Sequence, residues 1–520
     1  MDLPDIVHLV ADFLSQSDRA HLAQASRFYF QLVMPLAWRT VTGGTQLFKL
    51  IPGARIETPG TLTGTETIHL PRNINTIDFA RFKFYAKFVE HLLLFKNPAV
   101  IIKLNRWEEL LRYTDRNTLL PSLSSISLGT YWPQSISHYA WIAIFSSPSI
   151  RQIETSPLIR RNLPTLSSET ASAIFNLLVD RCPRIESLSI FVDPKQRTSP
   201  LENNFLSGSA LEEDTGGALF GAIKHARRLC CTSSMVEHCQ NTLLLLSRIS
   251  ELEVLQIYAS QQDDANMLPS ISLEPKAFSC LRSLALYDFR PQATLSILNL
   301  IASVAELTQL TLEINHNKDN KEEGPSADEF YNSNLIPTIC VRTPRLTHLS
   351  IRPIWDDKSQ VEINNSSLQL LASLCLKSFT LVRSQADVEC LPKLFPRIRT
   401  LRWPDQPLTF QQLRQLVTYG QLEHLSMKIT LSPPQMMESL QGRAVLPATP
   451  CVLEGDYGNI GALSQAEAKQ FLVCLAGLSR PLILQQTIPF DHPYCDFAAE
   501  RRLEELNKEL KRMHREQRRK

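Results

Sequence analysis

The sequence predicts an α/β protein in which three short helices precede an irregular solenoid of leucine-rich repeats. Such a solenoid has a curved parallel sheet with helices on its convex face. Two observations predict it. Apolar residues recur at three- and four-residue steps in the first forty residues, and an L-x-x-L-x-L string recurs ten times between residues 123 and 427. Most copies are 22 to 39 residues apart, which is room for one strand and one helix.

Composition limits the classes of protein that fit this sequence. The chain has 520 residues, 43% of them hydrophobic, which is enough for a continuous core. Its formal net charge of +2 argues against a protein that binds nucleic acid or membranes through a large basic surface. Eleven scattered cysteines favour a reducing compartment. The start does not resemble a secretory signal and no apolar run is long enough to span a bilayer, so we expect a cytoplasmic or nuclear protein with neither nucleic acid nor membrane as partner.

The first predicted helix lies between Leu3 and Leu14. Its apolar residues fall on one helical face. Pro4 suits the first turn, where its missing N–H costs nothing, and Asp5 favours the positive end of the helix.

Two further short helices are predicted before residue 40. Ser17 or Asp18 is expected to cap the second helix. The third runs through Phe28 and Leu36, and Pro35 is expected to end its regular part. Three helices in about 40 residues bury too little surface to be stable alone, so they must lean on a neighbouring domain or on a partner. The helix pattern by itself would also suit a cap on the solenoid.

The residue identities of this segment resemble the F-box, whose pattern is Leu-Pro-x-Glu-Ile-Leu, a later Leu, Asp-Leu, a Ser/Cys-Arg pair and a closing Leu-Trp-Arg. In that family the module binds the Skp adaptor of a cullin–RING ubiquitin ligase. This sequence departs from the pattern at Asp5, at Arg19-Ala20 and at Tyr29-Phe30. The matching residues are Leu3, Pro4, Ile6, Leu14, Asp18, Leu22, Ser26, Arg27, Trp38 and Arg39. The resemblance implies these contacts with the adaptor: Leu3, Pro4, Ile6, Leu9, Leu14 and Leu22. The segment from Arg81 to Val89 resembles a helix that is common after the F-box in fungal F-box proteins.

The ten repeat strings predict ten parallel strands. A proline stands two residues before the first apolar position in four copies, where it leads the chain into an extended segment. The first apolar positions are Leu123, Ile150, Ile185, Leu252, Leu281, Leu307, Leu346, Leu376, Ile398 and Leu422.

The spacing of these strings gives the expected domain boundaries. Residues 1–41 form the helical module, 42–120 a linker with the first irregular repeats, 121–490 the solenoid and 491–520 a charged helix or tail. Helices are expected at 171–180, at 295–302 and at 409–419 with Thr409 as cap, and the long interval after residue 190 has room for an extra strand near 226–230.

One face of the repeat strands is expected to bind a target protein. In L-x-x-L-x-L the intervening residues point away from the core, and six of the ten residues between the last two apolar positions are Ser or Thr. Larger side chains must then give specificity, and many of those in the later repeats are basic. We expect an acidic or phosphorylated target segment; ordinary solvated polar residues are the alternative. The candidates are His348, Arg352, Arg383, Arg402, His424 and Lys428.

Catalytic and metal chemistry have no sequence support. Cys230, Cys231, His238 and Cys239 lie close together but lack the spacing of zinc ligands. No Ser/His/Asp or Cys/His set has a supporting local motif, and we expect no cofactor. The basic end of the tail could be a nuclear-import or acidic-partner element, although a frayed, solvated helix is the expectation we favour.

These observations lead to two hypotheses of function. The first is a non-catalytic substrate receptor of an SCF-type ubiquitin ligase, in which the helices bind the Skp adaptor, and through it cullin, while the repeats bind a target. The second is a non-degradative scaffold whose helices only cap the repeats. An enzyme has no support from the sequence.

Overall fold

The chain is described by a computed structural model that divides into two compact units. Unit 1 comprises residues 1–262 and 277–280, and unit 2 comprises residues 263–276 and 281–520. The structure describes residues 3–519 with gaps. The residues outside the description are 1–2, 59–63, 73, 75–78, 95–99, 129–137, 156–162, 164, 194–214, 238–241, 261–272, 275, 303–305, 317–325, 356–359, 386, 389, 418–420, 430–449, 456–468, 470–471, 474, 477–481, 487–496 and 520.

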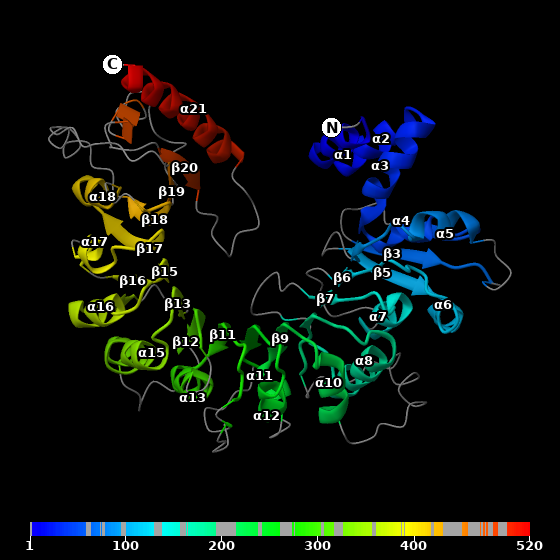
Figure 1. The fold of residues 1–520 in the computed structure, drawn as a ribbon, viewed down its shortest axis with the longest axis horizontal. Helices are drawn as coiled ribbons and strands as arrows, with labels where there is room; N and C mark the ends of the chain where they lie inside the picture. Colours follow the sequence, from blue (N-terminus) through cyan, green and yellow to red (C-terminus); the bar gives the residue numbers. More distant parts are fainter. Residues whose placement is uncertain are drawn as a thin grey trace. The chain divides into compact units, whose positions relative to one another are not determined.

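Unit 1 contains seven parallel strands that pair in chain order, and its helices lie on one face of that sheet (Figure 1). The strands are β1 (Thr40–Thr42), β4 (His91–Leu93), β6 (Ser125–Ser127), β7 (Gln152–Glu154), β8 (Ser187–Ser189), β9 (Arg228–Thr232) and β10 (Val254–Tyr258). A separate small sheet consists of β2 (Arg55–Glu57), β3 (Gly64–His69) and β5 (Val100–Asn105). The helices between the strands are α4 (Gly44–Phe48), α5 (Ala80–Ala86), α6 (Trp107–Thr114), α7 (His138–Phe145), α8 (Ser168–Arg181), α10 (Thr215–Ile223), α11 (Ser233–Glu237) and α12 (Thr242–Ser247).

The three predicted N-terminal helices are present at the start of unit 1. They are α1 (Leu3–Phe13), α2 (Gln16–Gln24) and α3 (Arg27–Arg39). Two details of the prediction are wrong. The second helix is capped by Ser15, whose hydroxyl accepts from the Asp18 N–H at 3.2 Å. The third helix continues past Pro35, because losing one backbone hydrogen bond does not outweigh the burial of Val33, Met34 and Ala37 on the same helix.

The α1–α3 module packs on the repeats through aromatic contacts with α5. The Trp38 and Tyr85 rings lie 4.7 Å apart, and Phe30 stacks with Phe84 at 6.1 Å. Its own core is small and consists of Val7, Ala11, Ala23, Val33, Met34 and Ala37. The module therefore leans on the neighbouring repeat, as its size requires.

Unit 2 repeats the same architecture with eight parallel strands in chain order (Figure 1). They are β11 (Ser283–Phe289), β12 (Gln309–Asn315), β13 (His348–Ile354), β15 (Ser378–Leu381), β17 (Thr400–Leu408), β18 (His424–Ile429), β19 (Cys451–Gly455) and β20 (Leu482–Gln486). A small pair is formed by β14 (Val361–Glu362) and β16 (Ser384–Gln385). The helices are α13 (Pro291–Ala302), α14 (Ala327–Glu329), the π-helix η3 (Phe330–Leu335), α15 (Ile336–Arg342), α16 (Asn365–Ala372), α17 (Leu391–Leu394), α18 (Phe410–Val417) and α21 (Phe497–Arg519).

All ten predicted repeat strands are confirmed, and so is the strand expected near 226–230, which is β9. The predicted cap of α18 is confirmed too. The Gln412 N–H donates to the Thr409 hydroxyl at 3.3 Å, and the Gln412 amide oxygen accepts from the Thr409 N–H at 3.0 Å.

The sequence reading missed four strands of the two repeat sheets, β1, β4, β19 and β20. Register explains why. Leu453 and Leu484 occupy the middle apolar position of β19 and β20, but Pro450 and Pro481 stand where the first leucine is expected. In β1 the first position is Trp38. In β4 it is Val89, and in β1, β19 and β20 the last position of the string also departs from the pattern, with Gly43, Gly455 and Gln486.

Helix α21 closes the free edge of β20. Leu503, Leu506 and Leu510 are buried, and the Asn507 side chain bonds both backbone groups of Leu484, accepting from its N–H at 2.8 Å and donating to its C=O at 2.9 Å. An unpaired edge strand is a liability, so this helix acts as a cap. The expectation of a solvated helix concerned the basic end that follows, where Lys511, Arg512 and Arg515 are exposed, and the structure does not contradict it.

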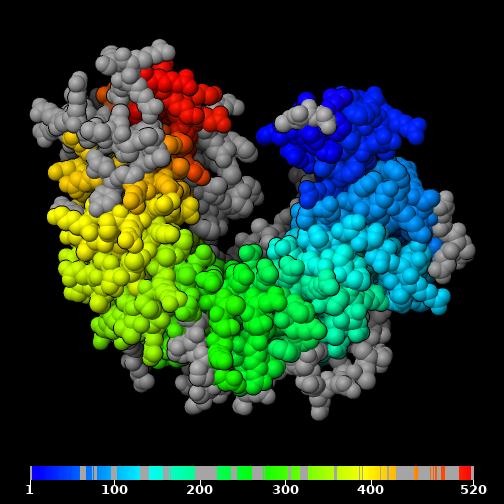
Figure 2. Space-filling model, viewed as in Figure 1, coloured from blue at the N-terminus to red at the C-terminus, as the bar shows by residue number. Residues whose placement is uncertain are grey.

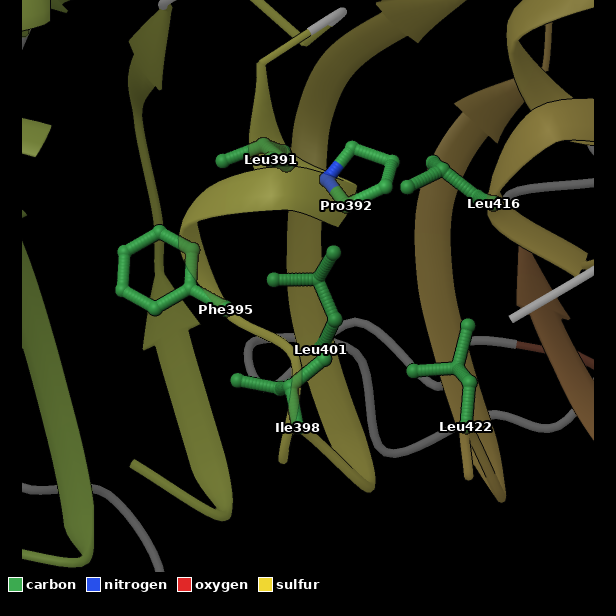
Figure 3. A pocket seen from close by; sticks show the side chains of 7 residues that line it. All are labelled: Leu391, Pro392, Phe395, Ile398, Leu401, Leu416 and Leu422. Atoms are coloured by element: carbon green, nitrogen blue, oxygen red, sulfur yellow. The ribbon is translucent and has the colours of Figure 1, made fainter. Parts of the chain in front are cut away.

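A small apolar cavity lies between helix α17, strand β17 and helix α18 (Figure 3). Its volume is about 10 Å³, close to the lower limit for one water, and its walls offer that water almost no polar partner. It is a packing gap and not a ligand site. The residues that line it are Leu391, Pro392, Phe395, Ile398, Leu401, Leu416 and Leu422. In the part of the chain that the structure describes, no helix combines the length and apolar character needed to cross a membrane.

Candidate functional site

Helix α1 has a second apolar face that the protein itself does not cover. Val7 and Ala11 point into the module core, whereas Leu3, Ile6 and Val10 are 59%, 44% and 48% exposed. At about 100° per residue these three share one side of the helix. In the space-filling view the surface of α1–α3 (dark blue) projects beyond the repeats of unit 1 that follow it (Figure 2).

The six residues implied as adaptor contacts divide into two groups. Leu3, Pro4, Ile6 and Leu9 are exposed on α1. Leu14 and Leu22 are partly buried, and Leu22 packs against the module core. Val10 and Phe13, which belong to the same apolar pattern but not to these six, are exposed on α1 as well. Phe13 is 85% exposed, the largest fraction among the exposed large hydrophobic residues of the described chain.

Two of the residues that depart from the F-box pattern, Arg19 and Phe30, make contacts within the protein. The Arg19 guanidinium donates to the C=O of Ala11 at 2.6 Å and of Asp12 at 3.1 Å, so it caps the C-terminal end of α1. The Phe30 ring stacks on Phe84 of α5. These substitutions hold the module together and do not interrupt its exposed apolar face.

A second candidate surface is the face of the unit 2 sheet that carries no helices, called here the helix-free face. Residues on it alternate along each strand with buried leucines, and the pairing register aligns them into rows across the strands. The first row is Gln309, His348, Ser378, Thr400 and His424. The second row is Thr311, Ser350, Thr380, Arg402, Ser426 and Glu454.

Arg352 lies on this face next to a buried carboxylate. Its guanidinium is 3.7 Å from the Glu313 carboxylate on the neighbouring strand, and the two side chains are 20% and 3% exposed. A carboxylate so far from water is costly unless a cation lies beside it. Arg352 is therefore engaged within the protein.

Arg402 and His424 share a single carboxylate. His424 Nε2 donates to Glu454 Oε2 at 2.6 Å, and Arg402 Nη2 lies 3.5 Å from the same oxygen. The His424 hydrogen bond, together with the charge of Arg402, holds the pKa of Glu454 below its usual value of 4.5 although burial opposes it. The Arg402 side chain is still 47% exposed, since its row neighbours Thr380 and Ser426 are too small to cover it.

This arrangement predicts a pH dependence of stability. Because the folded-state pKa of Glu454 is depressed, its contribution is present above about pH 4.5 and is lost as the pH falls through the lower folded-state pKa. We expect the free energy of unfolding to decrease less steeply in Glu454→Gln than in the wild type below about pH 4.5. Urea unfolding over a pH series measures both slopes, and identical slopes would contradict the assignment.

The other three predicted target contacts have different surroundings. Arg383 lies just after β15 with a positive φ of 52°, and it donates through its guanidinium to the Trp355 C=O at 2.6 Å. His348 and Lys428 are exposed on β13 and β18. Lys428 lies two residues beyond Ser426, the register partner of Arg402, and it pairs with Pro407 on the far side of a break in the register of β17. Glu454 was missed because its strand was missed.

The cysteine cluster noted in the sequence is structural where it is described. Cys230 and Cys231 lie on β9, and burial raises the pKa of Cys230 to about 12 and that of Cys231 further. Thiols with such pKa values are protonated and unreactive at neutral pH. His238 and Cys239 lie outside the described residues.

No protein-family model matches the sequence, and no curated protein is recognisably similar to it. Similar solved structures include a TLR13–ssRNA13 complex (14% identity, TM-score 0.32, 82% of this chain and 55% of that one) and a mouse RP105/MD-1 complex (15%, 0.30, 75% and 59%). A third is the leucine-rich repeat-containing protein LegL7 from Legionella pneumophila (13%, 0.25, 77% and 94%). The chain thus spans under two thirds of the length of the first two. Its own strand register and strand–helix alternation define a leucine-rich-repeat fold, an architecture suited to protein–protein interaction.

Proposed function

We propose that this protein is the substrate-recognition subunit of an SCF-type cullin–RING ubiquitin ligase. Helices α1–α3 bind a Skp-family adaptor and, through it, cullin. The repeats bind a target protein, so that the ligase acts on a substrate held nearby. The protein itself performs no chemistry and needs no cofactor, and it acts in the cytoplasm, the nucleus or both.

The uncovered face of α1 is the observation that carries this proposal. A helix that exposes Leu3, Ile6, Val10 and Phe13 along one side keeps apolar surface in water, and each such side chain is worth about 1.5–3 kcal/mol when it is buried. A partner with an apolar groove would gain that free energy. Leu3 and Ile6 also belong to the residues that resemble the F-box, and this resemblance supports a Skp-family adaptor as the partner.

The target surface is proposed on the helix-free face of unit 2. The structure divides the six basic candidates by their availability. Arg352 and Arg383 are held by Glu313 and by the Trp355 carbonyl, whereas the side chains of Arg402 and Lys428 are exposed. We therefore place the acidic or phosphorylated group of the target at Arg402 and Lys428, with His348 and His424 at its margin.

A non-degradative scaffold is the second candidate. It is favoured by the packing of α3 on α5, where Trp38 and Tyr85 join the module to the first repeats as a cap would. A cap alone does not use the exposed side of α1, so the two candidates differ in what they predict for substitutions there.

Co-purification of the Skp adaptor with the full chain tests the proposal. We expect recovery with the wild type and loss with Pro4→Ala/Ile6→Ala. His8→Ala/Asp12→Ala, two exposed positions on the opposite side of α1, is the matched control and should retain the adaptor. Absence of the adaptor from the wild type would favour the scaffold.

A further inference from the structure

The exposed side of helix α5 and of its C-cap residue carries cations and an aromatic ring. Arg81, Lys83, Phe84 and Lys87 are exposed, while Phe82 and Ala86 are buried against the repeats. Residues 80–89 contain no acidic side chain. Among the described residues, none places a carboxylate within ion-pair distance of Arg81, Lys83 or Lys87. We call the four exposed residues the α5 strip.

The Phe84 ring of the strip contacts other rings of the protein but remains partly exposed to solvent. Phe84 stacks with Phe30 of α3 at 6.1 Å and meets Phe88 edge-on at 5.8 Å, yet it remains 40% exposed. The Lys87 ammonium lies 4.9 Å from the Phe84 ring and 4.8 Å from the Phe88 ring. This cation–π contact fixes a positive charge beside an exposed ring. Aromatic rings and arginine are enriched at protein-binding surfaces, and Arg81 and Phe84 supply both here.

We propose that the α5 strip binds an acidic segment of a partner protein, whose carboxylates meet Arg81 and Lys83 and whose apolar side chain covers Phe84. The size of the strip favours this ligand. A helix of seven residues is about 10 Å long, which matches two or three carboxylates of a peptide. A nucleic acid or a lipid surface would be held by a wider field of cations. The proposal is independent of adaptor binding by α1.

Fluorescence anisotropy with the full chain tests the proposal. The probe is a fluorescein-labelled peptide in which pairs of Glu or Asp alternate with single Leu or Phe, and its control has Gln and Asn in place of the acids. We expect the acidic peptide alone to bind, and to bind more weakly as salt is raised, because exposed charges are screened. Lys83→Gln/Phe84→Ser should weaken its binding about tenfold or more.

A matched control variant tests whether the peptide binds at the strip itself or responds to any loss of one positive charge and one apolar side chain. Lys224→Gln/Val179→Ser removes one exposed lysine and one exposed apolar side chain elsewhere in unit 1, where Val179 is 41% exposed, and should leave binding unchanged. Lys83→Glu alone removes no packing contact of Phe84 and should also weaken binding if the first variant folds poorly. Equal affinity of the strip variants and the wild type would overturn the proposal. So would binding of a single-stranded oligonucleotide or of phosphatidylserine vesicles, but not of the peptide, through Lys83.

Discussion

Trp403→Ala is expected to lower the free energy of unfolding of unit 2 by about 3–5 kcal/mol, the range for deleting a fully buried large side chain. Trp403 is fully buried on β17, and its ring meets Phe379 edge-on at 6.0 Å. Its indole N–H also donates to the Ser384 C=O at 2.8 Å, which links β17 to β16. The substitution therefore leaves a cavity and an unsatisfied carbonyl together.

Urea unfolding followed by circular dichroism measures this loss. Trp355→Ala is the matched control, because Trp355 is a tryptophan of the same unit that is only partly buried. Its removal should cost less than half as much. Similar losses for both tryptophans would show that Trp403 is not the packing centre of its repeat.

Arg352→Ala is expected to cost about 3 kcal/mol, the lower end of the range for breaking a buried ion pair from one side. The Glu313 carboxylate, 3% exposed, would lose the guanidinium that lies 3.7 Å away. The exposed pair of Arg345 and Glu306 provides the control, and Arg345→Ala should cost less than about 1 kcal/mol.

The double variant Glu313→Leu/Arg352→Met tests the cause of this loss. Replacing both members of a buried pair by apolar residues of similar size is often neutral. We expect the double variant to recover most of the stability that Arg352→Ala loses. If it is as unstable as the single variant, the ion pair is not the reason for the loss.

Repeat strands could be predicted from the sequence wherever leucine or isoleucine holds the first apolar position. The apolar positions of the string are the residues that each repeat strand buries in the core, so the string locates the strand. All ten strands predicted in this way are present in the structure. The prediction failed at β1, β19 and β20, because Trp38, Pro450 and Pro481 hold that position in the sequence and glycine or glutamine holds the last one, so the string is absent there. The continuation of α3 past Pro35 was missed because tertiary packing overrides a local rule.

The candidate sites were less predictable, because the pairing of charges depends on neighbouring strands. The basic residues of the helix-free face could be named from the strand pattern, and Glu313 could be noted as an acid nearby. Glu454 could not be found, since it lies 30 residues beyond His424 on an unrecognised strand. Similarly, the spacing of Val10 and Phe13 placed them on α1, but only the packed module shows which side of α1 is left uncovered.

The central claim is that the exposed face of α1 binds a Skp-family adaptor, and calorimetric titration of the purified adaptor into the full chain tests it most directly. We predict saturable binding of one adaptor per chain. Ile6→Asp/Val10→Asp should weaken it by at least about 100-fold, or about 2.7 kcal/mol, with the thermal unfolding midpoint unchanged, since both side chains are exposed. No heat of binding with the wild type, or the same affinity in the variant, would contradict the claim.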